Sequence, residues 1–235
     1  ALAAQGVRHA MVDAVRDEDL HAIGTACRRQ RLLVGGAGLA LGLPQNFRDD
    51  NLLADHADAD ALGQVGGAAA VLAGSCSEAT RAQVADMAGR HPAVVIDPLT
   101  ADNPVHLAEA ALANASATLD RGETVLFYSS ADPAAVASIQ QRLGLEHAAT
   151  LVEQAFAHLA QALVARGVRR LVVAGGETSG AVVGALGVKA LAIGPQIDPG
   201  VPWTRVLGPQ PLLLALKSGN FGRTDFFSRA LEMVR

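Results

Sequence analysis

The sequence predicts an α/β protein with three layers, in which helices cover both faces of a mostly parallel, doubly wound sheet. Short apolar runs alternate with helical patterns along the chain, which indicates βαβ units. Most of these runs are continuously apolar, as is typical of parallel strands that are buried on both faces. Hydrophobic residues make up 50% of the 235 residues and aromatic residues only 3%, so small aliphatic side chains would fill the space between the layers.

Candidate strands recur from the N-terminus to the C-terminus. They are Ala10–Val12, Arg31–Val34, Ala69–Ala73, Val94–Ile96, Thr124–Tyr128, Arg170–Val173, Ala190–Ile193 and Leu212–Leu216. The clearest helix is Leu151–Arg166, where apolar residues recur at helical spacing and Gly167 follows as a stop signal. Further helices are expected from Glu78 onward and over Thr224–Val234.

The segment 44–67 interrupts this alternation, because it combines several aspartates with scattered glycines and has little strand signal. We interpret it as a linker or a loose helix. It would separate residues 1–43, the C-terminal remnant of a preceding domain, from residues 68–235, a self-contained αβα unit of ordinary domain size. The chain opens on Ala1 rather than on Met, which we interpret as the sign of a fragment.

Composition and charge argue against several classes of partner. The net charge of −4 and the pI near 6.0 give no basic footprint, so we expect no nucleic acid partner. No apolar stretch is long enough for a membrane span, and no signal peptide pattern opens the chain. Cys27 and Cys76 form no disulfide framework, so a reducing cytoplasm is the expected location. A homo-oligomer is compatible with the sequence but is not defined by it.

Three turns rich in glycine and hydroxyl groups each follow a candidate strand. Ligands of an open parallel sheet bind beyond the carboxyl ends of its strands, so these turns are the candidate sites. The first turn is Gly74-Ser75-Cys76-Ser77. Backbone N–H groups and the hydroxyls of Ser75 and Ser77 could approach an anion there, at the N-terminus of the next helix. An ordinary turn with a serine N-cap is the alternative.

The second turn is Gly175-Gly176-Glu177-Thr178-Ser179-Gly180. Gly175 and Gly176 permit positive φ angles and a close backbone approach, and the next three residues offer two hydroxyls and a carboxylate. This chemistry suits a phosphate cradle or a metal site. The turn is not a Walker A loop, because the lysine of that motif is missing. Helix capping with tight packing is the alternative.

The third turn is Lys217-Ser218-Gly219-Asn220-Phe221-Gly222. A lysine at the end of a buried strand, followed by Gly-Asn-x-Gly, would aim a charge and backbone amides at a phosphate. A plain turn is the alternative, because serine, glycine and asparagine all favour turns. We expect the three turns to line one cleft, with Lys217 facing its phosphate end. The strand before Lys217 could be parallel or antiparallel to the others.

Two further features admit a simpler explanation. Gly36, Gly38 and Gly42 resemble a loose dinucleotide fingerprint, but no acidic residue ends a second strand at the required distance, so packing is the expected role. Trp203 lies in a segment rich in proline and glycine, which we expect to be a loop. It would cover a purine ring or, more simply, fill a gap between elements.

Taken together, four motifs resemble the four-carbon acid sugar kinase family. They are Gly-Ser-Cys-Ser at 74–77, Gly-Gly-Glu-Thr-Ser-Gly at 175–180, Ile-Asp-Pro-Gly-Val-Pro-Trp at 197–203, and Lys-Ser-Gly-Asn-Phe-Gly-x-x-Asp-Phe-Phe at 217–227. Members of this family phosphorylate threonate, erythronate or 3-oxo-tetronate with ATP that is held mainly by the C-terminal domain. The resemblance implies that ATP or ADP contacts Ser75 and Ser77, Gly176–Ser179 and Gly219–Gly222.

The N-terminal half of that family, with its Asp-Asp-x-Thr-Gly-Ala motif and most contacts to the acid sugar, has no counterpart in this chain. We therefore expect nucleotide binding without kinase activity from this chain alone, and we assign no catalytic base. Glu177 and Asp198 are candidates to orient Mg²⁺, since they are carboxylates near the expected phosphates.

Three functions stay open at this point. The first is ATP-dependent phosphorylation of a four-carbon acid sugar, with this chain supplying the ATP-binding part. The second is a nucleotide-binding or sensing module without catalysis. The third is an NAD(P)-dependent Rossmann oxidoreductase that uses Gly35–Gly42, which the missing acidic partner disfavours.

Overall fold

The computed structural model describes residues 2–54, 58–129 and 133–234. The chain divides into two compact units, residues 1–59 and residues 60–235. The dividing point falls inside the segment 44–67 that the sequence predicts to be a linker, and residues 55–57 of that segment lie outside the described residues.

The first unit consists of short helical elements. They are the 3-10 helix η1 (Leu2–Gln5), α1 (Asp17–Ala26), the 3-10 helix η2 (Ala37–Gly42) and α2 (Leu43–Asp49). A Cβ atom on Gly24 of α1 would lie 2.4 Å from the backbone of Gly42, so only glycines allow α1 and η2 to pack this closely. This contact confirms that the glycine run packs the unit. Gly38 and Gly42 lie in the 3-10 helix η2, and no strand precedes them in the described part of this unit, so the run lacks the context of a dinucleotide fingerprint.

Two strand predictions in the first unit are wrong. Ala10–Val12 and Arg31–Val34 adopt irregular structure, and Met11 and Val34 are 98% and 90% exposed. A strand is stable only when a neighbouring strand satisfies its backbone hydrogen bonds, and the described part of this unit offers only helical and irregular segments. The apolar pattern alone therefore does not produce a strand here.

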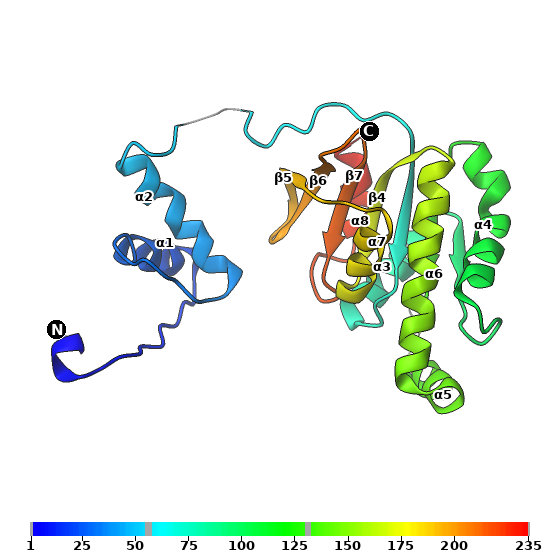
Figure 1. Cartoon of the computed structure of the whole chain (residues 1–235), viewed down its shortest axis with the longest axis horizontal. Helices are drawn as coiled ribbons and strands as arrows, with labels where there is room; N and C mark the ends of the chain where they lie inside the picture. The colour runs from blue at the N-terminus through cyan, green and yellow to red at the C-terminus, as the bar shows by residue number, and fades with distance from the viewer. Residues whose placement is uncertain (1, 55–57, 130–132, 235) are drawn as a thin grey trace. The chain divides into compact units, whose positions relative to one another are not determined.

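The second unit contains a seven-stranded mixed sheet with the order β2-β3-β1-β4-β7-β6-β5. Figure 1 shows β5, β6, β7 and β4 of this sheet. The strands from β2 to β7 in this order pair in parallel, whereas β6 is antiparallel to both of its neighbours. The predicted α/β fold with a mostly parallel sheet is confirmed. The strands are β1 (Ala68–Ala73), β2 (Ala93–Val95), β3 (Val125–Tyr128), β4 (Val168–Ala174), β5 (Leu191–Asp198), β6 (Val201–Val206) and β7 (Leu213–Lys217).

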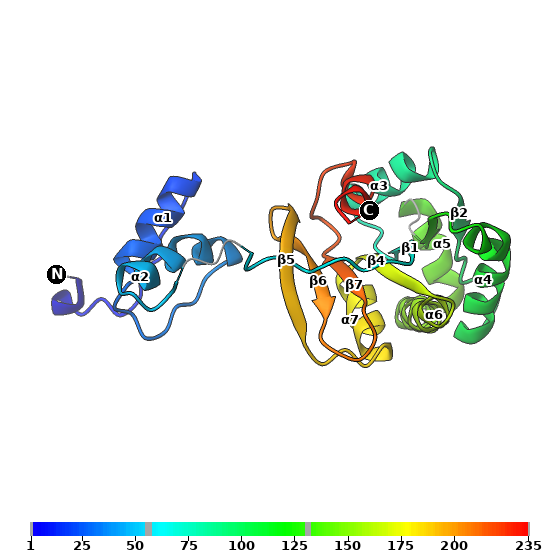
Figure 2. The ribbon, with the colours of Figure 1, turned by 90° about the horizontal axis from the view of Figure 1, so that it is seen from above.

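Helices cover both faces of this sheet, which forms the middle layer (Figure 2). Helices α4, α6 and α7 pack on one face, and α3 and α8 pack on the other. Consecutive residues of β1 point alternately into these two cores and are almost completely buried, which explains why the strand sequences are continuously apolar. The helices are α3 (Glu78–Ala88), α4 (Pro104–Asp120), α5 (Pro133–Leu143), α6 (Leu145–Ala165), α7 (Gly176–Ala185) and α8 (Phe226–Glu232).

Helix α6 shows how the sequence pattern produces packing. Leu151, Ala155 and Leu159 recur at intervals of four residues and are buried against the sheet and α4. Gly167 follows the helix with a φ of 95°, in the left-handed region that suits glycine. The predicted helix is confirmed and begins six residues earlier than expected, at Leu145 rather than Leu151. Among the described residues, no helix is long and apolar enough to span a bilayer.

The loop predicted around Trp203 is instead strand β6, the second strand of a hairpin. Pro199 and Gly200 form its two-residue turn, and Gly200 has a φ of 79°. The Trp203 side chain is fully buried between the sheet and α8, and its Nε1 donates a hydrogen bond of 2.8 Å to the carbonyl of Ala230. The gap-filling role of Trp203 is therefore confirmed.

Candidate nucleotide-binding site

The three predicted turns meet at one edge of the sheet, because β1, β4 and β7 are adjacent and parallel. Backbone hydrogen bonds join the turns directly. The N–H groups of Gly74 and Ser75 donate to the carbonyl of Ala174 at 3.0 and 3.2 Å, and Gly175 N–H donates to the carbonyl of Lys217 at 2.9 Å. Strand β7 is parallel to β4, which resolves the orientation that the sequence leaves open.

Small residues are required where the turns touch. Gly175 precedes α7 with a φ of 129°, a conformation that other residues rarely adopt. A Cβ atom on Gly74 would lie 2.2 Å from Thr178 Oγ1, and one on Gly219 would lie 2.3 Å from Ser75 Oγ. The first turn is thus in van der Waals contact with both of the others.

The serine and threonine hydroxyls at the start of α3 hold the third turn. Ser77 is the N-cap of α3 and accepts a hydrogen bond of 3.2 Å from Thr80 N–H, so the capping interpretation of this serine is confirmed. The same hydroxyl donates to the carbonyl of Gly219 at 2.6 Å. Thr80 Oγ1 donates to that carbonyl as well, at 2.8 Å. Ser77 therefore stabilises the helix and also connects two turns.

A cavity of about 410 Å³ opens beside the first and second turns, within the range of small-molecule sites. Its polar end lies at the N-termini of α3 and α7, and its apolar wall comes from α5 and α6. The lining residues are Gly74, Ser75, Cys76, Pro98, Ser129, Val136, Ile139, Gln140, Leu145, Ala148, Ala149, Val152, Glu153, Gly175, Glu177 and Thr178.

The predicted site residues divide into two groups. Ser75, Gly175, Glu177 and Thr178 line the cavity. The others lie close by but outside its lining: Ser77, Gly176, Ser179, Lys217, Ser218, Gly219, Asn220, Phe221 and Gly222. The sequence did not reveal the apolar wall, because its residues resemble ordinary core residues of an amphipathic helix. In the structure, the wall differs from an ordinary core helix in one respect: none of the described residues of α5 is buried.

Lys217 is placed differently from the sequence-based expectation. Its side chain is 1% exposed, and its Nζ donates hydrogen bonds of 3.0 Å to Thr80 Oγ1 and to the carbonyls of Ser218 and Gly219. Burial lowers the pKa of Lys217 to about 8. The ammonium group thus faces protein oxygens rather than the cavity.

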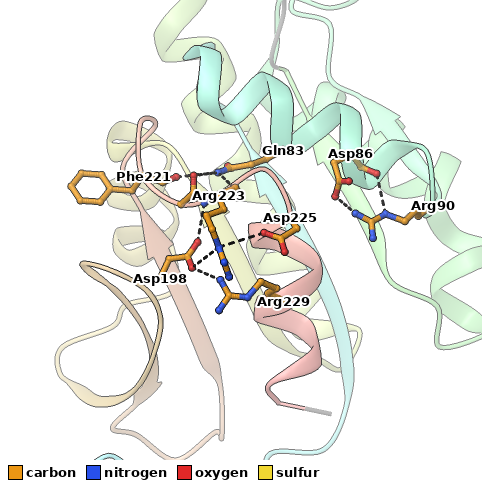
Figure 3. A network of polar contacts seen from close by, with 9 residues as sticks. Gln83, Asp86, Arg90, Asp198, Phe221, Arg223, Asp225 and Arg229 are labelled. Atoms are coloured by element: carbon orange, nitrogen blue, oxygen red, sulfur yellow. Dashed lines mark hydrogen bonds and ion pairs between the residues drawn. The ribbon is translucent and has the colours of Figure 1, made fainter.

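Asp198, at the end of β5, lies in a network of arginines (Figure 3). One carboxylate oxygen accepts a hydrogen bond of 2.9 Å from Arg223 N–H, and the other pairs with the Arg229 guanidinium. Burial alone would raise the pKa of Asp198, but these two donors outweigh it and hold the pKa below its ordinary value. Both oxygens are therefore engaged, whereas Glu177 is one of the residues that line the cavity.

Comparison with known proteins supports the resemblance seen in the motifs. The sequence profile described as the nucleotide-binding C-terminal domain matches residues 70–227. The 3-oxo-tetronate kinase of Burkholderia multivorans is 53% identical over 99% of this chain and 54% of its own length. The corresponding kinase of Cupriavidus necator is 52% identical over 100% of this chain and 54% of its own length.

Solved structures show the same fold. Crystal structures of a Salmonella typhimurium LT2 protein and of Haemophilus influenzae protein HI1011 are 38% and 35% identical, with TM-scores of 0.85 and 0.75. Each comparison covers 100% of this chain and 55% of the other chain.

The fold and the matched profile define a nucleotide-binding α/β domain. More particularly, the chain belongs to the four-carbon acid sugar kinase family and carries the nucleotide-binding C-terminal domain of that family. The chain spans about half the length of the curated relatives that it matches.

Proposed function

We propose that this chain supplies the ATP-binding part of an enzyme that phosphorylates a four-carbon acid sugar, with 3-oxo-tetronate as the first substrate to test. The observation that carries the proposal is the convergence of three glycine-rich turns at the carboxyl edge of a parallel sheet, where the first two turns line a cavity. The relatives that are about half identical and named 3-oxo-tetronate kinases support this choice of substrate.

The cavity suits the two chemically different ends of ATP. Its polar end combines small residues with the N-termini of α3 and α7, where backbone N–H groups and the helix dipole favour phosphate. Its other end is an apolar slot between α5 and α6, whose apolar lining suits a flat base. Gln140 and Glu153 also line this slot. We place the phosphates near Ser75 and Thr178 and the base in the slot.

Of the two carboxylates proposed for Mg²⁺, only Glu177 fits. Glu177 is a lining residue at the polar end of the cavity, whereas both oxygens of Asp198 are engaged by Arg223 and Arg229. Magnesium bound with ATP would neutralise charge on the phosphates and orient the transferred group. In this proposal Glu177 helps to orient the magnesium, and Asp198 has a structural role.

The acid sugar and its catalytic base belong, in our proposal, to a part of the enzyme that residues 1–235 do not contain. Residues 1–43 would be the end of that acid-sugar domain, since apolar side chains such as Met11, Leu32 and Val34 are at least 80% exposed in the described structure. This chain would therefore bind nucleotide without transferring phosphate to a sugar acid.

Calorimetric titration of the whole chain tests the proposal. We expect saturable binding of Mg-ADP and Mg-ATP, no comparable binding of NAD, and no turnover of 3-oxo-tetronate. Tighter binding of NAD than of ADP would instead revive the oxidoreductase hypothesis. Turnover by this chain alone would show that the acceptor site lies within residues 1–235.

A further inference from the structure

Side chains of α3 and Lys217 hold the carbonyl groups of the third turn, and Asp198 accepts a hydrogen bond from its last N–H group, that of Arg223. Gln83 is fully buried, and its Nε2 lies 3.0 Å from each of the carbonyl oxygens of Phe221, Gly222 and Arg223 (Figure 3). The carbonyl of Gly219 also faces α3, because Ser77 and Thr80 donate to it there.

Lys217 completes this arrangement. An ammonium group has three donors, and the three oxygens at 3.0 Å from Lys217 Nζ match them in number. One of these oxygens belongs to Thr80, and the other two are carbonyls of the turn itself, Ser218 and Gly219. The lysine therefore binds the turn to the first turn of α3. To contact a phosphate, the buried ammonium group would have to give up all three of these hydrogen bonds, which is costly.

The direction of the carbonyls determines the direction of the amides. In a trans peptide the C=O and N–H bonds point to opposite sides. Because the Gly219 carbonyl faces α3, the N–H of Asn220 faces away from it. The peptide that joins Phe221 to Gly222 is oriented by Gln83 in the same way. Phe221 N–H donates to the carbonyl of Ser218 at 3.3 Å, and Arg223 N–H donates to Asp198 at 2.9 Å. The N–H groups of Asn220 and Gly222 are thus the ones that this argument directs away from α3, where they can meet an anion.

We propose that Lys217 is a positioning residue, which together with Ser77, Thr80 and Gln83 orients turn 218–223 so that the N–H groups of Asn220 and Gly222, rather than the lysine, meet a nucleotide phosphate. The inference rests on the proposed nucleotide-binding function. It differs from the direct electrostatic role that the sequence suggests for Lys217, and the two roles predict different measurements.

The first measurement follows the pKa of Lys217 by NMR in the whole chain, made with ¹³C-labelled lysine. The chain has only two lysines, Lys189 and Lys217, so the signals are readily assigned by substitution. Without nucleotide we expect a pKa of about 8 for Lys217. A positioning role predicts that saturating ADP leaves this value nearly unchanged. A phosphate in direct contact would raise it by about one unit or more, and that result would overturn the proposal.

The second measurement compares Lys217→Met with the exposed control Lys189→Met. The first variant should speed amide hydrogen exchange in turn 218–223 and weaken ADP binding about tenfold, as expected for the loss of charged hydrogen bonds. The control should change neither quantity. Thr80→Val serves as a second variant with the same expected direction if Lys217→Met does not fold, as judged by circular dichroism. Unchanged exchange and affinity in a folded variant would contradict the proposal.

These measurements distinguish the positioning role of Lys217 from the proposed nucleotide-binding function on which it rests. If the unsubstituted chain binds no ADP, the proposed function fails, and with it the claim that the amides meet a phosphate. The exchange comparison still decides whether Lys217 holds the turn. If ADP binds and exchange in the turn is insensitive to Lys217, only the positioning role is lost.

Discussion

At the scale of single residues, the site depends on glycines and on one buried lysine. Gly74, Gly175 and Gly219 stand where the three turns touch, and their close contacts leave no room for a side chain. Lys217 is charged yet buried, which disfavours folding unless hydrogen bonds compensate, and its three oxygen partners provide that compensation. Both features lower the stability of the domain at the carboxyl edge of the sheet, where the three turns meet.

Gly175→Ala should destabilise the domain by about 1 kcal/mol or more and weaken ADP binding, because the φ of 129° is unfavourable for alanine. Gly180→Ala is the matched control, since it lies in α7 with open space around its Cβ position. The control should keep ADP affinity and slightly raise the melting temperature. Thermal unfolding and ADP titration measure both effects. Equal behaviour of the two variants would refute the conformational argument.

The lowered pKa of Lys217 predicts a pH dependence of stability. Below about pH 8 the lysine is charged in both the folded and unfolded states, and above pH 10.5 it is neutral in both. Between these values only the unfolded state holds the proton, so the free energy of unfolding should rise with pH because of this group. Urea denaturation of the chain relative to Lys217→Met isolates the contribution. A difference that stays constant across this window would rule out the lowered pKa.

At the scale of elements, the sequence predicted most of the second unit. The hydrophobic period predicted the helix at 151–166 and the strands that become β1, β3, β4 and β7. Parallel topology then predicted that the turns after β1, β4 and β7 meet. Strand β6 was missed because Pro199, Gly200 and Pro202 resemble a loop, although a two-residue Pro-Gly turn is itself a hairpin signal.

The cavity was less predictable than the turns. Its apolar wall depends on the angle between α5 and α6, which no local pattern encodes. The hydrogen bond of Lys217 to Thr80 joins residues 137 positions apart in sequence. The strands expected at Ala10–Val12 and Arg31–Val34 failed for a related reason, since a strand depends on a neighbour that its own sequence does not specify.

The slot between α5 and α6 can be tested by filling it. Ala149→Trp places a large ring among the apolar lining residues and should weaken ADP binding about tenfold or more through lost apolar contact. Pyrophosphate binding should be unaffected, because the polar end of the cavity is unchanged. Gln154→Trp, at an exposed position of the same helix, is the control. Calorimetry with both ligands measures the separation, and an equal loss for ADP and pyrophosphate would argue against a base in the slot.

Asp198 joins the end of β5 to α8 and to the third turn. Asp198→Asn should lower the free energy of unfolding by about 1–3 kcal/mol at neutral pH, because Arg229 loses its charged partner. The pKa of Asp198 is lowered in the folded state, so this contribution is present above its ordinary value of 3.8 and disappears as pH falls through the lowered value. Urea denaturation at neutral and acidic pH measures the difference. A pH-independent difference would contradict the ion-pair explanation.

At the scale of the whole molecule, the chain combines a nucleotide-binding domain of clear family membership with a small helical unit that exposes many apolar side chains. About half the length of the related kinases is represented. A kinase that divides its substrates between domains can bring phosphoryl donor and acceptor together only when both are present. Under the proposed function, such a division is the reason why nucleotide binding and catalysis are separate expectations for this chain.

A crystal structure of the chain with Mg-ADP tests the central claim most directly. The account predicts the ADP phosphates at the N-termini of α3 and α7, within hydrogen-bond distance of the turns at Ser75 and Thr178, and the adenine between α5 and α6. It also predicts Lys217 Nζ still bound to Thr80 and to the carbonyls of the third turn. Nucleotide bound anywhere else, or beside the glycine run at Gly35–Gly42, would contradict the account.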